Sequence, residues 1–155
     1  MGNDERVKTV ALRYADNFAP ECGTIAAHRE LIDELGFVWY GKLGSPISKE
    51  AADMILESGD PKILLIHSGS QERFWAHVKE IRRSTPPQAE IPEYYRSNAD
   101  KFSCWFRVSR FEKAPKDIMS KCIVSSSGKK LSSASRHSMS PYFKIELDED
   151  EGKND

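Results

Sequence analysis

The chain has 155 residues, of which 39% are hydrophobic and 30% charged, a composition that predicts one globular domain with a real core. It contains no run of about 18 consecutive apolar residues, which argues against a membrane span, and its first residues lack the apolar core of a signal peptide. The net charge is −1, and because residues 148–155 hold five acids and one lysine, the remainder carries +3. We therefore expect a mildly basic domain over 1–147 and an acidic disordered tail over 148–155.

Hydrophobic periodicity and turn residues predict the elements of the first half of the chain. Residues 7–13 alternate as a strand, and Thr24 is the expected N-cap of a helix that Gly36 ends. A strand follows over 37–42, and Ser48 is the expected N-cap of a second helix. That helix is followed by a turn and two further strands, near 62–67 and 73–82.

The second half is predicted to consist mainly of strands and loops. Three prolines (Pro86, Pro87 and Pro92) predict a long surface loop over 84–100, and an aromatic-rich strand follows over 102–111. The last expected elements are a helical turn around 115–120 that leads to Ile123-Val124, a serine-rich basic segment over 125–140 and a closing strand over 141–147. Two helices followed mainly by strands predict an α+β domain, whose five or six strands form a curled sheet or small β-barrel with flanking helices.

The most informative motif is the apolar run 62–66, which ends in the polar turn His67-Ser68-Gly69-Ser70 and leads into Phe74-Trp75. The other two tryptophans, Trp39 and Trp105, also lie in predicted strands near polar residues. If their neighbours face the core, strand alternation directs Trp75 and Trp105 to the opposite face. Flat apolar walls with a few hydrogen-bonding groups are what a pocket for one planar heterocycle requires.

Metal and disulfide sites are not expected. The three cysteines, Cys22, Cys104 and Cys122, are widely spaced and form no CxxC pair, which favours buried thiols in an intracellular protein, cytoplasmic or nuclear. His77 and His137 have no partner at metal-ligand spacing, and His28 lies on the apolar side of the first helix as a core or rim residue. We therefore expect no metal and no cofactor.

The order of short segments resembles the PUA-like superfamily, and within it the EVE domain, a relative of the YTH domain. The resemblance covers most of the chain, from about residue 7 to 147. Each piece is short, so their order carries the resemblance: Trp39-Tyr40-Gly41-Lys42, Gly59-Asp60, Leu65-Ile66-His67-Ser68, Phe74-Trp75-Ala76-His77-Val78, Tyr94-Tyr95 and Trp105-Phe106-Arg107-Val108.

The resemblance implies a nucleic-acid-binding reader module without catalysis. YTH domains bind N6-methyladenine in RNA through an aromatic cage, and EVE domains are thought to accept a modified base, often a modified cytosine in DNA. The partner would be DNA or RNA carrying a modified base, with a possible effector protein. The base-binding residues would be Trp39, Tyr40, His67, Ser68, Trp75 and Trp105. The phosphate-binding residues would be Lys42, Arg82, Arg83, Lys129, Lys130 and Arg136.

Two other readings stay open at this stage. PUA-like folds also include ASCH domains, some of which resemble small amidohydrolases or nucleases acting on a modified nucleoside or RNA. Such an enzyme would need Lys42 as an activated base, with Glu72 or Glu80 and Thr24 nearby. Alternatively, the serine-rich segment 125–140 is a docking loop of a protein-interaction module, and the tryptophans are core residues.

Overall fold

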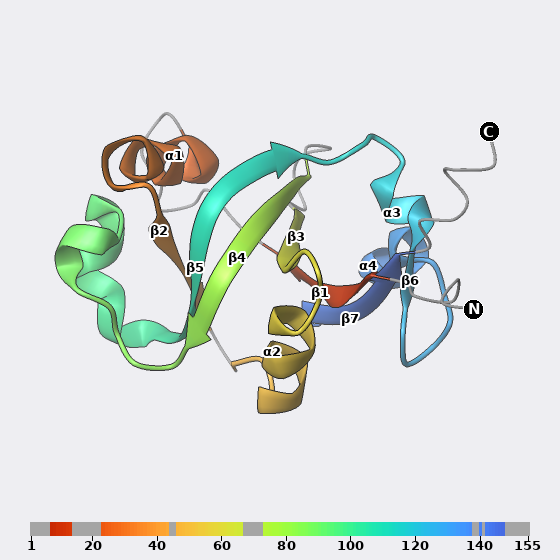
Figure 1. The fold of residues 1–155 in the computed structure, drawn as a ribbon. Coiled ribbons are helices and arrows are strands. Elements are labelled where there is room, and N and C mark those ends of the chain that lie inside the picture. Colours follow the sequence, from red (N-terminus) through yellow and green to blue (C-terminus); the bar gives the residue numbers. More distant parts are fainter. Residues whose placement is uncertain are drawn as a thin grey trace.

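The computed structural model describes residues 7–13, 23–43, 46–66, 73–137, 140 and 142–147. Figure 1 shows how the elements are arranged. In chain order they are β1 (Val7–Arg13), α1 (Thr24–Leu35), β2 (Val38–Leu43), α2 (Lys49–Leu56), β3 (Lys62–Ile66), β4 (Phe74–Arg82), the 3₁₀ helices η1 (Gln88–Glu90) and η2 (Glu93–Lys101), β5 (Phe102–Lys113), α3 (Ile118–Lys121), β6 (Cys122–Val124), α4 (Leu131–His137) and β7 (Tyr142–Leu147).

The strands form one seven-stranded sheet in the order β2-β5-β4-β3-β1-β7-β6. Within the described part of the chain, β1 and β3 run parallel and the other neighbouring pairs are antiparallel. The prediction of an α+β domain is confirmed. The prediction of a curled sheet or small barrel of five or six strands is wrong, because the sheet has seven strands and is neither closed nor strongly curled.

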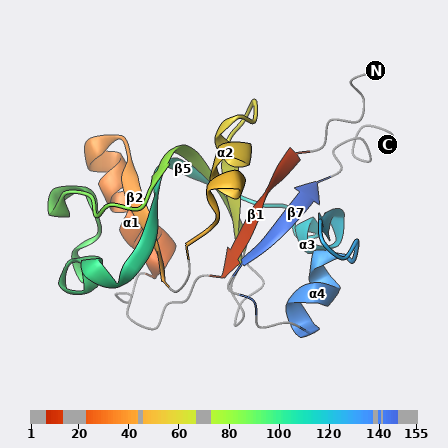
Figure 2. The same cartoon turned by 90° about the horizontal axis from the view of Figure 1, so that it is seen from below.

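Helices cover the two faces of this open sheet, so its side chains are buried without closure into a barrel. One face packs against α1 and α2, and its core includes Val10, Tyr40, Phe106 and Phe111. The opposite face carries two separate clusters, one under α3 and α4 and the other under η1 and η2. Figure 2 shows β1 and β7 side by side, with α3 and α4 beyond β7.

Local signals decided the helix ends. Gly36 ends α1 in the left-handed conformation at φ 88°, and its N–H donates to the carbonyl of Ile32 at 2.8 Å, as predicted. The Ser48 hydroxyl accepts from the N–H of Ala51 at 3.1 Å and caps α2, also as predicted. The prediction of Thr24 as an N-cap is wrong, because Thr24 is the first helical residue and Gly23 is the N-cap without a side-chain bond.

The prediction of a surface loop over 84–100 is also wrong. This segment forms η1 and η2, whose Ile91, Tyr95 and Ala99 are buried against the sheet. Pro87 and Pro92 occupy the N-cap positions of the two 3₁₀ helices, where no backbone N–H is needed. Of the helices in the described residues, none is long and apolar enough to cross a membrane.

Candidate functional site

The three tryptophans are buried and lie in two different clusters. Trp39 is 3% exposed, and Trp105 has no exposed surface; both pack under η2, whereas Trp75, which is 4% exposed, belongs to the cluster under α3 and α4. Phe74 and Phe106, the neighbours of Trp75 and Trp105, lie in the core on the α1–α2 face, so the alternation expected for these two tryptophans holds. The structure therefore does not bring the three indoles together, and a role for them in base binding stays a prediction.

Trp39 is held by specific partners. Its indole Nε1–H donates to Glu90 Oε1 of η1 at 2.9 Å, and the Arg82 guanidinium lies 4.5 Å from the ring centre. These contacts join β2, β4 and η1 on the sheet face away from α1. A base would stack on this indole only after Arg82 or the η1–η2 segment moved.

Tyr40 lies on the other face, in a group of rings around His28 of α1. The His28 ring centre lies 5.3 Å from that of Tyr40, 5.1 Å from Tyr95 and 6.1 Å from Phe111. Because Nδ1 is 2.8 Å from the Thr24 carbonyl oxygen, Nδ1 carries the proton and donates. Nε2 is then an acceptor, and it is buried without a hydrogen-bond partner in the described residues.

Burial keeps this histidine neutral. Desolvation lowers the pKa of His28 to about 4, and the hydrogen bond to Thr24 only partly opposes that shift. A neutral imidazole with a free acceptor nitrogen recognises an N–H donor without adding a charge. His28 is thus a core histidine, as expected, but one with an unused acceptor.

Lys42 lies on the same side of β2 as Tyr40. It follows Tyr40 by two residues, so alternation puts both side chains on the α1 face. Lys42 is 6% exposed, and its Nζ lies 5.3 Å from the ring centre of Tyr142 in β7, although β2 and β7 are not neighbours in the sheet. Desolvation by burial lowers the pKa of Lys42, an effect that the Cys104 thiol partly opposes.

We call His28, Tyr40, Lys42 and Tyr142 the polar–aromatic strip. It combines flat rings, an ammonium donor and a neutral acceptor on one face of the sheet, which are the groups that recognise a planar heterocycle. Tyr142 pairs with Leu12, next to the end of β1, and β1 ends beside the end of β3. His67 and Ser68 follow β3 in the chain but lie outside the described residues.

The predicted phosphate contacts are distributed over separate parts of the fold. Arg82 is half-buried on Trp39, and Arg83 is exposed, with a guanidinium N–H that donates to the Ile47 carbonyl at 3.3 Å. The remaining three are exposed in the β6–α4 segment at the far edge of the sheet: Lys129, Lys130 and Arg136. Their role in phosphate binding stays a prediction.

An ASCH-like enzyme would also need Thr24 and either Glu72 or Glu80. Thr24 is buried, and its hydroxyl accepts from Tyr94 at 3.3 Å. Glu80 pairs with Arg107 in the β4–β5 ladder, and Glu72 lies outside the described residues. Across the described ranges, no three His, Cys, Asp or Glu side chains are arranged to hold a metal ion.

Sequence reasoning missed Tyr142 and the ring group around His28. The alternation of 142–147 was visible, but nothing local indicates that Tyr142 meets Lys42, a residue one hundred positions earlier. The Tyr94-Tyr95 pair could have been found by its aromatic content, although it was assigned to a surface loop. Both rings in fact lie near His28, and Tyr95 is buried.

Comparison with curated proteins and with solved structures gives no significant match. A protein-family model does match, over residues 10–151, which is most of the chain, and its description is Pua-like. Domains of this kind commonly bind nucleic acids. The matched residues include the sheet, the helices on both of its faces and the whole polar–aromatic strip, so the chain belongs to the Pua-like family.

Proposed function

We propose that this protein is an EVE-type reader that binds a modified nucleobase, a modified cytosine or N6-methyladenine, displayed by DNA or RNA. The observation that carries the proposal is the polar–aromatic strip, in which Lys42 reaches from β2 to the Tyr142 ring of β7. The base would stack on Tyr40 or Tyr142, and the Lys42 ammonium would donate to a ring nitrogen or carbonyl oxygen. His67 and Ser68, which follow β3, would complete the recognition of the base edge.

The energetics of base insertion fit such a site. Removing a base from its stack costs a few kcal/mol, and aromatic stacking recovers roughly 1–3 kcal/mol per base. An added methyl group contributes on the order of 0.8 kcal/mol when it is buried. Discrimination of the modified base therefore requires a close fit around the methyl group, which in this proposal the rings of the strip would supply. The domain over 1–147 would act as one unit, with an effector protein as a further partner.

Titration of labelled oligonucleotides tests the proposal. Three otherwise identical oligonucleotides carry unmodified cytosine, 5-methylcytosine or N6-methyladenine at one position. We expect a preference for one modified oligonucleotide, a loss of that preference in Tyr40→Leu, and no such loss in Met119→Leu, which lies in α3 on the opposite face. Equal, weak binding of all three that depends only on salt would reject the reader.

The second candidate function is that of an ASCH-like amidohydrolase or nuclease. The observation that favours it is the buried Lys42, whose pKa is lowered by desolvation, as an activated base requires. Incubation of the protein with modified nucleosides or RNA, followed by product detection, separates the two candidates. Turnover by the wild type that is absent in Lys42→Ala and retained in the exposed control Lys101→Ala would favour the enzyme.

A further inference from the structure

Two β-bulges face each other in the middle of the sheet. In the β4–β5 ladder His77 pairs with Arg110, Val78 with Val108 and Glu80 with Arg107. The residues left over are Ser109 on β5 and Lys79 on β4, one extra residue on each strand. Bulges redirect side chains and are over-represented next to functional sites.

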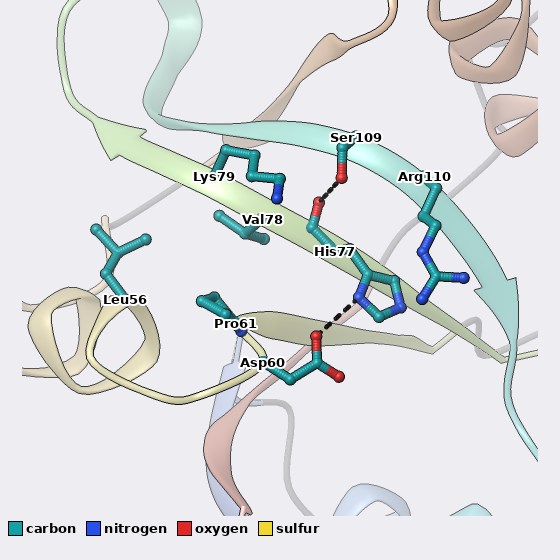
Figure 3. Close-up of a pocket in the computed structure, with 8 residues that line it drawn as sticks. All are labelled: Leu56, Asp60, Pro61, His77, Val78, Lys79, Ser109 and Arg110. Carbon is teal, nitrogen blue, oxygen red and sulfur yellow. Dashed lines mark hydrogen bonds and ion pairs between the residues drawn. The ribbon is translucent and has the colours of Figure 1, made fainter.

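A cavity of about 350 Å³ lies at these bulges, a volume within the range of small-ligand sites. Figure 3 shows it between β4, β5 and the turn that leads from α2 into β3. Leu56, Pro61 and Val78 supply apolar lining, and both extra residues, Ser109 and Lys79, also line it. The register shift thus adds two polar side chains, those of Ser109 and Lys79, to the lining of the cavity.

The cavity extends from Leu56 at the end of α2 to side chains of β4 and β5. His77 follows Trp75 by two residues on the same strand, which puts it on the face away from α1 and α2. On that face, η1 and η2 cover one end of the sheet and α3 and α4 cover the other, with β4 and β5 crossing between them (Figure 1).

His77 contacts two nearby carboxylates through its two ring nitrogens. Its Nδ1 is 3.2 Å from Asp60 Oδ1, and its Nε2 is 2.8 Å from Glu112 Oε1. The hydrogen bond from His77 is the main reason that the pKa of Glu112 is lowered. Lys62 Nζ lies 3.7 Å from Asp60 Oδ2 and compensates that carboxylate as well.

Two cations remain for a ligand. Lys79 and Arg110 line the cavity, and neither makes a hydrogen bond or salt bridge within the described part of the chain. In Figure 3, Arg110 lies on one side of the His77 ring and Asp60 on another. Asp60 and Glu112 carry two negative charges, and Lys62, Lys79 and Arg110 carry three positive charges, so these five side chains have a net charge of +1.

We propose that this cavity binds a phosphate group through Lys79 and Arg110, at a site separate from the polar–aromatic strip. Arginine and lysine are the side chains that bind phosphate oxygens through charge-assisted hydrogen bonds. The Ser109 hydroxyl, which here makes only a 3.5 Å contact with the His77 carbonyl, provides a further donor. The phosphate comes either from a small phosphate ester or from the backbone of a bound nucleic acid.

Heteronuclear NMR titration of the full chain tests this site. The probes are inorganic phosphate, adenosine monophosphate and a short single-stranded oligonucleotide of unmodified bases. We expect saturable shifts at the backbone amides of 77–80 and 109–110, and an affinity about tenfold lower in the double variant K79A/R110A. The control R96A/K101A removes the same charge from exposed positions of η2 and should bind as the wild type does, whereas K79R/R110K should retain binding.

Each outcome decides the proposal. Saturable binding of phosphate or the nucleotide that K79A/R110A loses supports it with a small ester as the source. Binding of the oligonucleotide alone, again lost in K79A/R110A, supports it with the nucleic-acid backbone as the source. No shifts at these amides, or equal binding by K79A/R110A and its control, overturns it. Because Tyr40→Leu should leave these shifts unchanged, the reader proposal and this one fail separately.

Discussion

The buried His28 should make the protein lose stability in acid by an amount that the structure sets. In the folded protein the pKa of His28 is about 4, against 6.5 for the unperturbed side chain, so the unfolded chain binds a proton that the folded protein does not. Stability is therefore fully present above pH 6.5 and falls as the pH decreases towards 4. The two pKa values give a loss of about 2 kcal/mol at pH 5 and about 3 kcal/mol at pH 4.

Urea unfolding at pH 7, 5 and 4 measures this loss in the wild type and in His28→Phe. The variant keeps an aromatic ring in the group but has no proton to bind, so its stability should fall less with pH, by about 2 kcal/mol at pH 5. His28→Gln serves as a second variant that does not titrate. Its absolute stability will be lower, yet it should show the same weaker pH dependence. Equal pH dependence in all three proteins would refute the burial of a neutral His28.

Three further changes test the packing around β2 and α2. Gly41→Ala should lower the unfolding free energy by about 1–3 kcal/mol, because the new Cβ would lie 2.6 Å from Phe102 Cδ1. Urea unfolding measures this loss. An unchanged unfolding midpoint would contradict the close packing of Phe102 on Gly41. The lowered pKa of Lys42 means that the folded protein releases this proton before the unfolded chain does, so the stability of the wild type should rise as the pH increases towards 10.5. Lys42→Met should remove this rise. An equal change in the unfolding free energy of wild type and variant between pH 7 and pH 10 would argue against burial of Lys42. Ser48→Ala should lower the melting temperature by the loss of about 1 kcal/mol of helix capping, and Ser48→Asp should restore it.

Local chemistry explains which parts of the fold could be predicted. Periodicity located the longer strands but not the short β6, and Gly36 and Ser48 marked helix ends because their roles depend only on neighbouring residues. The prediction for residues 84–100 was wrong because the structure of this segment depends on contacts with distant residues. Its prolines were interpreted as helix breakers, whereas Pro87 and Pro92 begin 3₁₀ helices that are stabilised by burial against distant strands.

The candidate site shows the same limit. Alternation correctly put Trp75 and Trp105 on the face opposite Phe74 and Phe106, but sequence alone could not tell which face of the sheet is covered by η2. The approach of Lys42 to Tyr142 joins residues far apart in both the chain and the strand order. Neither periodicity nor composition carries that information. The double bulge of β4 and β5 was hidden as well, because a register shift depends on both strands at once.

Cross-linking most directly tests the claim that the strip on the α1 face receives a nucleobase. An oligonucleotide carrying the preferred base is irradiated in complex with the protein, and the adduct is located by mass spectrometry after digestion. We predict an adduct on the peptide that contains Tyr40 and Lys42 or on the one that contains Tyr142, and its loss on competition with unlabelled modified oligonucleotide. Adducts confined to Trp75, or to segments on the opposite face of the sheet, would contradict it.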